Sequence, residues 1–372
     1  MIEELTIDNF KLHKHTELDM KGLTLLTGVN GMGKSSAVQA LLLLRQSYLS
    51  NDLADGLNLK GNLCSIGYAG ELACQTSDSE VLKLTINDSE GKRSVWEFLY
   101  PEDINETFLS RKDDNENDTS LSLFTNDFQY IGAFRFGPQK IYGRDTSIVK
   151  TRRQISKEMG QCEYAVNFLF QYQKDNIAIR ELALPNDDGT FSYDLDSQVD
   201  LWMRRISPNI QVKIESQQQD FILKYKFFRD KNTMTDDVSA LNTGFGITYV
   251  LPILVAMLSS KKGSLIIIEN PEAHIHPTGQ SVLMELITRA VCHGVQVVLE
   301  THSDHIINGG LVAIHNGVIS ASDVSVYFFE RNETEHVANP VLLKISDKGH
   351  IKRPPKGFFD QFTKDLHLLM DV

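Results

Sequence analysis

The stretch "GVNGMGKSS", residues 28–36, has the spacing G-x-x-x-x-G-K-[ST]. The apolar run "GLTLLTG" leads into it and "SSAVQALLLLRQSYL" follows, which predicts a strand, a glycine-rich turn and a helix in succession. Glycines allow consecutive backbone N–H groups to wrap around a phosphate, and the helix N-terminus adds partial positive charge. The alternatives are a chance match or a turn that serves only packing. The flanking strand and helix favour a phosphate-binding loop, hereafter the P-loop.

The P-loop predicts contacts with ATP and Mg²⁺. Lys34 is expected to reach the β- and γ-phosphates, and the hydroxyl of Ser35 is expected to bind the metal ion. The predicted ATP-binding residues of this segment are Gly28, Asn30, Gly31, Gly33, Lys34, Ser35 and Ser36.

Two later apolar runs end in polar residues that fit the same site. "SLIIIEN" ends in Glu269, and a carboxylate at the end of a strand beside a P-loop can orient the Mg²⁺ shell, so Glu269 is the second predicted metal ligand. "VQVVLETHS" leads to His302, which could hydrogen-bond the γ-phosphate and report its presence. The alternatives are a solvated acidic turn at Glu269 and a structural histidine at His302.

The segment "LNTGFG", residues 241–246, precedes a predicted helix and offers a second anion-binding helix terminus. Its separation from the P-loop in sequence suggests that it serves the γ-phosphate held by another subunit. The alternative is an ordinary helix N-cap formed by Asn242 or Thr243. The predicted ATP-binding residues of this segment are Asn242, Thr243, Gly244 and Gly246.

Alternation of apolar strands with helices predicts an α/β fold with a buried, mostly parallel sheet flanked by helices, as in P-loop NTPases. "LKLTIND" and "SVWEFLY" predict an antiparallel β subdomain, and residues 151–206 have a helical pattern followed by a hairpin, "IQVKIES" with "FILKYKFF". The expected parts are an ATPase lobe (1–142, with a flexible loop near 110–120), a helical and hairpin insertion (143–238), a second ATPase lobe (239–335) and an appendage (336–372).

The order "GVNGMGKSS … LNTGFG … LIIIENPEAHIHP … ETHSDH" resembles the ABC-type ATPase heads of the SMC/RecF/OLD group. "ENPEAHIHP", "ETHSDHIING" and "PKGFFDQ" look like small standalone bacterial ATPases of the kind found in antiphage defence systems. The resemblance implies a homodimer or higher homo-oligomer with ATP in composite sites, between residues 28–36 of one chain and 242–246 of the other. It also suggests that Arg135 lies where relatives couple their lobes to the phosphates; a surface ion pair is the alternative.

The chain departs from the pattern of this group at Asn270, where relatives carry the catalytic glutamate. Asparagine cannot take a proton from water, so a general-base contribution of roughly 10²–10⁴-fold would be lost. Glu272 is a candidate substitute base, although a carboxylate that fixes the following turn is the simpler interpretation. His302 could also orient the water. The predicted enzyme is a slow ATPase with Glu269, Asn270, Glu272 and His302 as its catalytic candidates.

Charge limits how the chain could contact nucleic acid. Lys and Arg number 37 against 49 Asp and Glu, a net charge of −12, so such contact requires a local basic patch. The candidates are "IKRPPK" and "VKTRRQISK", the latter with Lys150, Arg152, Arg153 and Lys157. Short runs of this kind are more often solvated faces.

Histidines at four nearby positions raise the alternative of a zinc site, but no cysteine or third-ligand spacing supports it. These histidines are His274, His276, His302 and His305.

Scattered cysteines, no signal-peptide pattern and no apolar run near ~20 residues predict a cytoplasmic protein without a membrane partner. The leading functional hypothesis is ATP-dependent dimerisation that regulates a separately encoded effector, such as a nuclease, or engages DNA. A non-hydrolysing ATP-gated scaffold that holds a partner protein is the alternative. The "NFK" opening and the long middle disfavour a nucleotide-binding subunit of an ABC transporter.

Overall fold

The computed structural model describes residues 1–112, 115, 117–229, 233–331, 334, 336–359 and 361–370. Residues 113, 114 and 116 of the loop predicted near 110–120 lie outside this part. The strands are β1 (Ile2–Phe10), β2 (His13–Asp19), β3 (Leu23–Gly28), β4 (Gly56–Asn58), β5 (Val81–Asp88), β6 (Arg93–Leu99), β7 (Phe108–Ser110), β8 (Phe128–Ile131), β9 (Tyr142–Gly143), β10 (Ile210–Ser216), β11 (Asp220–Phe227), β12 (Val238–Ser239), β13 (Leu265–Glu269), β14 (Gln296–Glu300), β15 (Val324–Arg331) and β16 (Ala338–Leu342). The helices are α1 (Lys34–Leu49), α2 (Ala165–Tyr172), α3 (Leu195–Ile206), α4 (Phe245–Leu258), α5 (Pro277–Cys292), α6 (Asp304–His315) and α7 (Gln361–Leu369). Short helical turns are Ala69–Glu71, Ser122–Phe124, Ser147–Thr151, Arg180–Leu182, Ala240–Asn242 and Ala321–Asp323.

A six-stranded sheet in the order β16-β15-β3-β14-β13-β8 forms the centre of the molecule. Its neighbouring strands are parallel except for the pair β15–β16. The strands predicted from "GLTLLTG", "FQYIGAF", "SLIIIEN" and "VQVVLETHS" all lie in it, so the predicted buried parallel sheet is confirmed. β16 lies beyond the boundary predicted at residue 335 and still belongs to this sheet.

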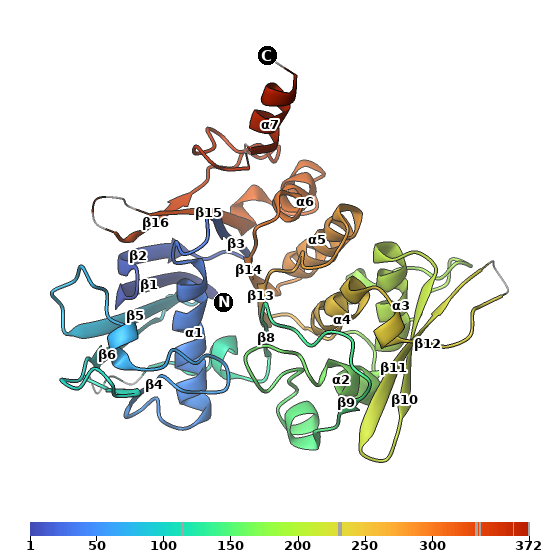
Figure 1. Cartoon of the computed structure of the whole chain (residues 1–372), viewed down its shortest axis with the longest axis horizontal. Coiled ribbons are helices and arrows are strands. Elements are labelled where there is room, and N and C mark those ends of the chain that lie inside the picture. Colours follow the sequence, from blue (N-terminus) through green and yellow to red (C-terminus); the bar gives the residue numbers. More distant parts are fainter. Residues whose placement is uncertain are drawn as a thin grey trace.

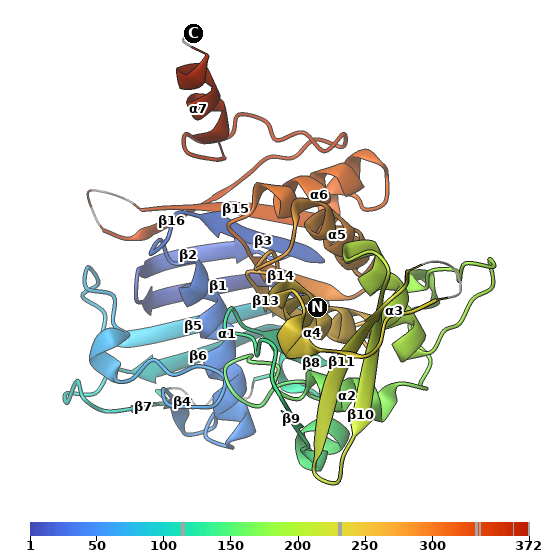
Figure 2. The ribbon, with the colours of Figure 1, turned by 45° about the vertical axis from the view of Figure 1, so that its right-hand side comes forward.

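The central strands are apolar throughout because both faces of the sheet are covered. On β13, Leu265 and Ile267 face a core shared with α1 and the β1–β2 region, whereas Ile266 and Ile268 face the core shared with α2 to α6. Successive side chains of a strand point to opposite faces, so a strand between two cores needs an unbroken apolar run. Figures 1 and 2 show α4, α5 and α6 gathered on one side of β13 and β14, with α1 on the other.

A second sheet, of order β2-β1-β5-β6, is antiparallel and packs with α1 on one face of the central sheet (Figure 1). This is the β subdomain predicted from "LKLTIND" and "SVWEFLY". The turn between β1 and β2 places Lys11 close to the end of the P-loop, because Nε2 of His13 donates a hydrogen bond to the carbonyl of Gly33 (3.0 Å).

The insertion contains the predicted hairpin, β10 paired with β11, and it is less helical than expected. In residues 151–206 only α2 and α3 are regular helices of more than one turn. Gly160 lies before α2, and Pro185 and Gly189 lie between α2 and α3. They interrupt the helical pattern, since glycine and proline disfavour a helix interior.

The helix α7 follows the last strand and lies apart from the other helices in both views (Figures 1 and 2). Each helix in the described part of the chain is too short or too polar to cross a bilayer.

Candidate functional site

The carboxyl ends of β3, β14 and β13 bring three predicted motifs to one edge of the central sheet. In the register of the sheet, Glu300 pairs with Glu269 on one side and with Leu26 on the other. A cavity of about 460 Å³ opens at this edge, hereafter the P-loop cavity. The predicted site residues that line it are Asn30, Gly31, Gly33, Lys34, Ser35, Ser36, Glu269, Asn270 and His302.

The P-loop has a backbone shape that its glycines permit. Gly28, Gly31 and Gly33 have φ values of 130°, 73° and 103°, a region that other residues occupy at a cost. The ammonium group of Lys34 donates hydrogen bonds to the carbonyl oxygens of Gly28 (3.0 Å) and Val29 (2.9 Å). Burial lowers the pKa of Lys34, and the Glu300 carboxylate opposes this shift. The loop therefore presents a buried cation beside consecutive backbone amides.

Glu300, at the end of β14, is a buried carboxylate inside this site. Its Oε1 accepts a hydrogen bond from the hydroxyl of Ser35 (2.9 Å), and its Oε2 is buried without a partner in the described structure. Burial, followed by repulsion from Glu269, raises the pKa of Glu300 to about 7. The two carboxylates, on adjacent strand ends, thus repel each other where they are partly shielded from water. A bound cation would relieve this repulsion.

Glu269 ends β13 as predicted and is held by a phenol. Oε1 of Glu269 accepts a hydrogen bond from the hydroxyl of Tyr130 on β8 (3.0 Å). Burial raises the pKa of Glu269, and its hydrogen bonds and the charge of Arg135 oppose that shift. The hydroxyl of Ser35 bonds to Glu300 and not to Glu269, although all three residues line the same cavity.

The backbone of Asn270 is fixed from two sides. Its N–H donates to the carbonyl of Glu300 (2.9 Å), and its own carbonyl accepts from Nη2 of Arg135 (2.8 Å). Nη1 of Arg135 also donates to the carbonyls of Glu269 (2.7 Å) and Gly132 (2.9 Å). Arg135 is buried, with 3% of its surface exposed, so the surface ion pair considered for it is wrong. The asparagine has φ 46°, a left-handed conformation that asparagine tolerates better than glutamate.

Glu272 bonds to the segment that follows β14. Its Oε2 accepts from the hydroxyl of Thr301 (2.8 Å), and its Oε1 accepts from the backbone N–H of His302 (2.8 Å). Both carboxylate oxygens are therefore engaged, and Glu272 is not among the residues that line the P-loop cavity. His302 lines the cavity, and burial followed by the charge of Lys34 lowers its pKa.

The segment 241–246 begins α4 but does not line the P-loop cavity of its own chain. Gly244 is the N-cap of α4, and the hydroxyl of Thr243 donates to the carbonyl of Ser239 (3.0 Å). A Cβ atom on Gly246 would lie 2.0 Å from the carbonyl oxygen of His274, so this glycine is required for packing. Asn242 and Gly244 are exposed.

The histidines considered for zinc have structural contacts. His276 caps α5, its Nδ1 accepting from the N–H of Thr278 (3.3 Å). The ring of His274 packs edge-on against Phe245 and Tyr249. Within the residues that the structure describes, no group of three or more His, Cys, Asp or Glu is arranged to hold a metal ion.

The chemistry of the donors at the cavity fits Mg²⁺ better than zinc. Ser35, Glu269 and Glu300 supply only oxygen atoms, which Mg²⁺ prefers, and Mg²⁺ commonly retains water and phosphate oxygens as its other ligands. The unpartnered Oε2 of Glu300 is an orphaned buried acceptor at the same place. These three residues would hold the ion.

Six residues that line this cavity were not predicted from the sequence, and three of them bear on its chemistry: Glu300, Lys11 and Phe134. An acidic residue at the end of a wholly apolar strand was the available signal for Glu300, and it was the same signal that identified Glu269. Nζ of Lys11 donates to Gln39 on α1 (2.7 Å), and Phe134 is 85% exposed at the cavity. No local pattern marks these two, since the turns that carry them reach the cavity only in the folded chain.

A protein family described as "AAA domain, putative AbiEii toxin, Type IV TA system" matches residues 23–308, which include every site residue predicted from the sequence. The chain belongs to this family. Membership in it implies a P-loop ATPase that binds a nucleotide, typically with Mg²⁺. A second family, "Protein of unknown function (DUF3696)", matches residues 319–369. No curated protein matches the chain.

Two solved structures share the fold of this AAA-family chain. "Crystal structure of the SmcHead bound to the C-winged helix domain of ScpA" superposes with a TM-score of 0.54 at 13% identity, covering 93% of this chain and 98% of that one. An Smc head domain with an extended coiled coil, bound to the C-terminal domain of ScpA from Pyrococcus furiosus, gives 0.51 at 12% identity, covering 99% of both chains. The predicted ATPase-head fold of the SMC/RecF type is therefore confirmed.

Proposed function

We propose that this AAA-family protein is an ATP-dependent switch that binds ATP with Mg²⁺, joins a second copy through the nucleotide, and hydrolyses the nucleotide slowly. The observation that carries this proposal is a cavity with the features needed to bind phosphate but without a free carboxylate placed to act as general base. Asn270 stands where a base would be needed, and both oxygens of Glu272 are engaged by Thr301 and His302.

The residues of the cavity have distinct parts in this proposal. Backbone amides of the P-loop and the ammonium group of Lys34 bind the phosphates, and His302 contacts the γ-phosphate. Ser35, Glu269 and Glu300 hold Mg²⁺, which when bound neutralises charge on the phosphate oxygens. Without a carboxylate at position 270, water beside the γ-phosphate has no strong proton acceptor, and turnover is slow.

The proposal that the protein dimerises rests on the segment 241–246. This segment is partly exposed at the start of α4 and does not contribute to the P-loop cavity of its own chain, which supports a role toward another copy. Asn242, Thr243 and the α4 N-terminus would bind the γ-phosphate held by the partner, so each composite site would need two chains.

We propose that a separately encoded effector, such as a nuclease, responds to whether ATP is bound. The Smc heads that share this fold were solved with a domain of ScpA bound, and the family description names a toxin of type IV toxin–antitoxin systems. Both support an ATPase head that acts through another protein, with bacterial antiphage defence as the setting and DNA engagement as the alternative.

Molar mass and phosphate release together test the proposal. Light scattering on the purified protein should show a shift from monomer to dimer on addition of ATP and Mg²⁺, and Asn242→Asp, which places a negative charge toward the γ-phosphate, should abolish it. Phosphate release should be slow, well below the ~1–10³ s⁻¹ of typical enzymes. An unchanged mass under all conditions, or rapid turnover by the protein alone, would contradict the switch. Nucleotide-dependent dimers with no measurable phosphate release would favour the non-hydrolysing scaffold.

A further inference from the structure

A second cavity lies at the far end of α1, away from the P-loop. It has a volume of about 310 Å³ and is lined by the C-terminal part of α1, residues 58–63 and residues 148–157. Four of its lining residues are cations, and the rest of the described lining contains no aspartate or glutamate. The cations are Arg45, Lys60, Arg152 and Lys157, and this cavity is hereafter the basic pocket.

Arg45 is the unusual member of the basic pocket, because it is a buried charge without a carboxylate partner. Only 2% of its surface is exposed. Nη1 donates to the carbonyls of Leu123 and Thr125, the latter at 3.0 Å, and the guanidinium lies 4.0 Å from the ring centroid of Phe128. Nε is buried with no hydrogen-bond partner in the described structure. Burial lowers the pKa of Arg45, and the charge of Arg152 lowers it further.

The other cations of the basic pocket add further positive charge that is not balanced by a carboxylate. Lys60, Arg152 and Lys157 are exposed, and their side chains make no ion pair with any described carboxylate. The side-chain amides of Gln46 and Asn62 also line the cavity. A buried, unpaired charge is costly, and a chain with a net charge of −12 has many acidic residues available to offset it. None of the lining positions in the described structure uses one.

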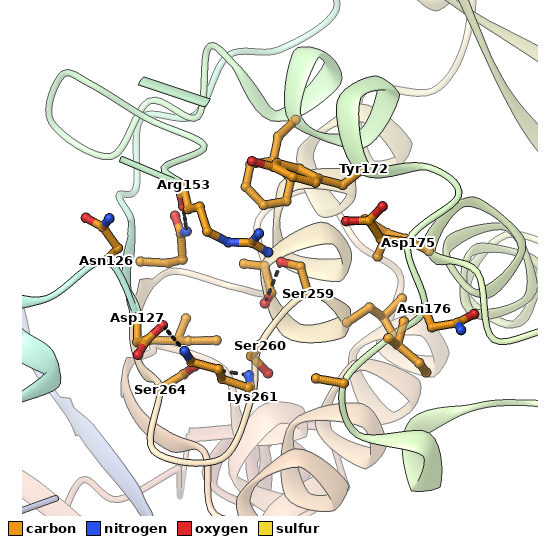
Figure 3. A pocket seen from close by; sticks show the side chains of 18 residues that line it. Asn126, Asp127, Arg153, Tyr172, Asp175, Asn176, Ser259, Ser260, Lys261 and Ser264 are labelled. Carbon is orange, nitrogen blue, oxygen red and sulfur yellow. Dashed lines mark hydrogen bonds and ion pairs between the residues drawn. The ribbon is translucent and has the colours of Figure 1, made fainter. Parts of the chain in front are cut away.

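A neighbouring cavity gives an internal comparison (Figure 3). It shares Asn126 with the basic pocket and is lined by Arg153, Tyr172 and Lys261, but its walls also carry Asp127 and Asp175. There Nζ of Lys261 pairs with Asp127 at 2.9 Å, and the guanidinium of Arg153 lies over the ring of Tyr172. The charges of that cavity are balanced within the protein, whereas those of the basic pocket are not.

We propose that the basic pocket binds a phosphate group of a nucleotide, either free or within a nucleic acid. Guanidinium groups match the planar, bidentate geometry of phosphate oxygens, and ammonium groups add point charges around them. Arg45 would contribute the buried contact, and Arg152 and Lys157 would close over the phosphate from the exposed side. The run "VKTRRQISK" then acts as one wall of a binding site in addition to being a solvated segment.

The basic pocket is separate from the P-loop cavity. Lys34 and Arg45 lie on the same helix, α1, eleven positions apart, which is about 17 Å along the helix axis. The two cavities share no lining residue. The proposal therefore does not depend on whether ATP is hydrolysed or whether the protein dimerises.

Binding measurements in a Lys34→Ala background test the basic pocket, because that change removes the P-loop lysine and so weakens phosphate binding at the P-loop cavity. The probes are AMP, inorganic phosphate and a short single-stranded DNA with a terminal phosphate. Arg152→Glu should weaken binding about tenfold or more, since it replaces a charge-assisted contact by repulsion. Arg93→Glu is the matched control, with the same charge change at an exposed position on β6, and should bind as the background protein does.

Arg45→Met should also abolish binding. If that buried change prevents folding, the exposed variants Arg152→Glu and Lys157→Glu are sufficient to test whether the pocket binds phosphate. Binding of AMP or inorganic phosphate would identify the ligand as a small phosphorylated molecule. Binding of DNA alone would identify it as a nucleic acid, and the affinity should then weaken steeply between about 50 and about 200 mM salt. Equal affinities of the Arg152→Glu and Arg93→Glu proteins would overturn the proposal. So would the failure of all three probes to bind the Lys34→Ala protein.

Discussion

The hydroxyl of Ser35 donates a hydrogen bond to Oε1 of Glu300 at 2.9 Å, which connects the start of α1 to the end of β14. The neighbouring strand end carries Glu269 in register with Glu300. A serine hydroxyl and two carboxylates therefore meet at one point of the sheet edge. This arrangement makes Glu300 as strong a candidate for Mg²⁺ binding as Glu269.

Glu300→Gln tests this role, because glutamine keeps an oxygen that can accept from Ser35 and removes the charge. The Mg²⁺ concentration that supports half-maximal ATP binding should rise by about 10–100-fold. Calorimetric titration of ATP at a series of Mg²⁺ concentrations measures it. Glu285→Gln, which changes a partly exposed carboxylate paired with Arg205, is the control. A Mg²⁺ dependence that is unchanged by Glu300→Gln would remove Glu300 from the metal site.

Asn270→Glu should accelerate ATP turnover by about tenfold or more, because it supplies the missing proton acceptor. Asn270→Gln is the matched control, with the same length and no base. Both changes put a longer side chain at φ 46°, so both should lower the free energy of unfolding by about 1 kcal/mol. Phosphate release and urea denaturation measure the two effects. Equal turnover in the two variants would show that position 270 does not limit the reaction.

Glu272→Gln should reduce turnover by less than about tenfold, because Glu272 orients Thr301 and His302 and is not the base that receives a proton. The carboxylate raises the pKa of His302, so the variant should also have a lower His302 pKa in an NMR titration. A change in this pKa distinguishes positioning of His302 from a general loss of stability. A loss of turnover of about 10²-fold or more with an unchanged His302 pKa would instead identify Glu272 as the general base.

Acid should destabilise the fold around the P-loop through His13. Burial lowers the pKa of this histidine to about 4, from its ordinary value of 6.5. The folded state therefore binds fewer protons between these values, and the free energy of unfolding should decrease as the pH falls from 6.5 to about 4. The total loss should be on the order of 3 kcal/mol.

His13→Gln should flatten this pH dependence, because glutamine can donate to the carbonyl of Gly33 without titrating. Urea denaturation at about pH 7 and about pH 5 measures the slope. His350→Gln, at an exposed position, should leave the slope of the wild-type protein in place. If the slope of His13→Gln equals that of the wild type, another group is responsible.

Arg135→Lys should lower the free energy of unfolding by about 2–3 kcal/mol, because one ammonium group cannot serve the carbonyls of Gly132, Glu269 and Asn270 together. Arg205→Lys changes a partly exposed ion pair with Glu285 and should cost less than about 1 kcal/mol. Equal stabilities of the two variants would show that the three bonds of Arg135 contribute little.

The fold and the P-loop could be predicted because their signals are local. Strands such as β13 and β14 need an unbroken apolar run when both faces are covered, and the P-loop needs glycines at fixed spacing, so each can be identified in a short window. The same holds for Glu269, which ends an apolar strand. The environment of Arg135 was not predictable in this way, because its acceptors are backbone carbonyls that carry no sequence signal.

The sequence by itself determined the P-loop, the parallel sheet and the presence of an amide, Asn270, directly after the acidic strand end, since all three depend on residue type within one segment. Only the tertiary structure decided which side chains meet: Glu300 with Ser35, Glu272 with Thr301, and Arg45 with an acid-free pocket. The physical reason is that charge pairing and burial depend on distances between segments far apart in the chain. Those distances are set by strand register and by the packing of α1 against the sheet.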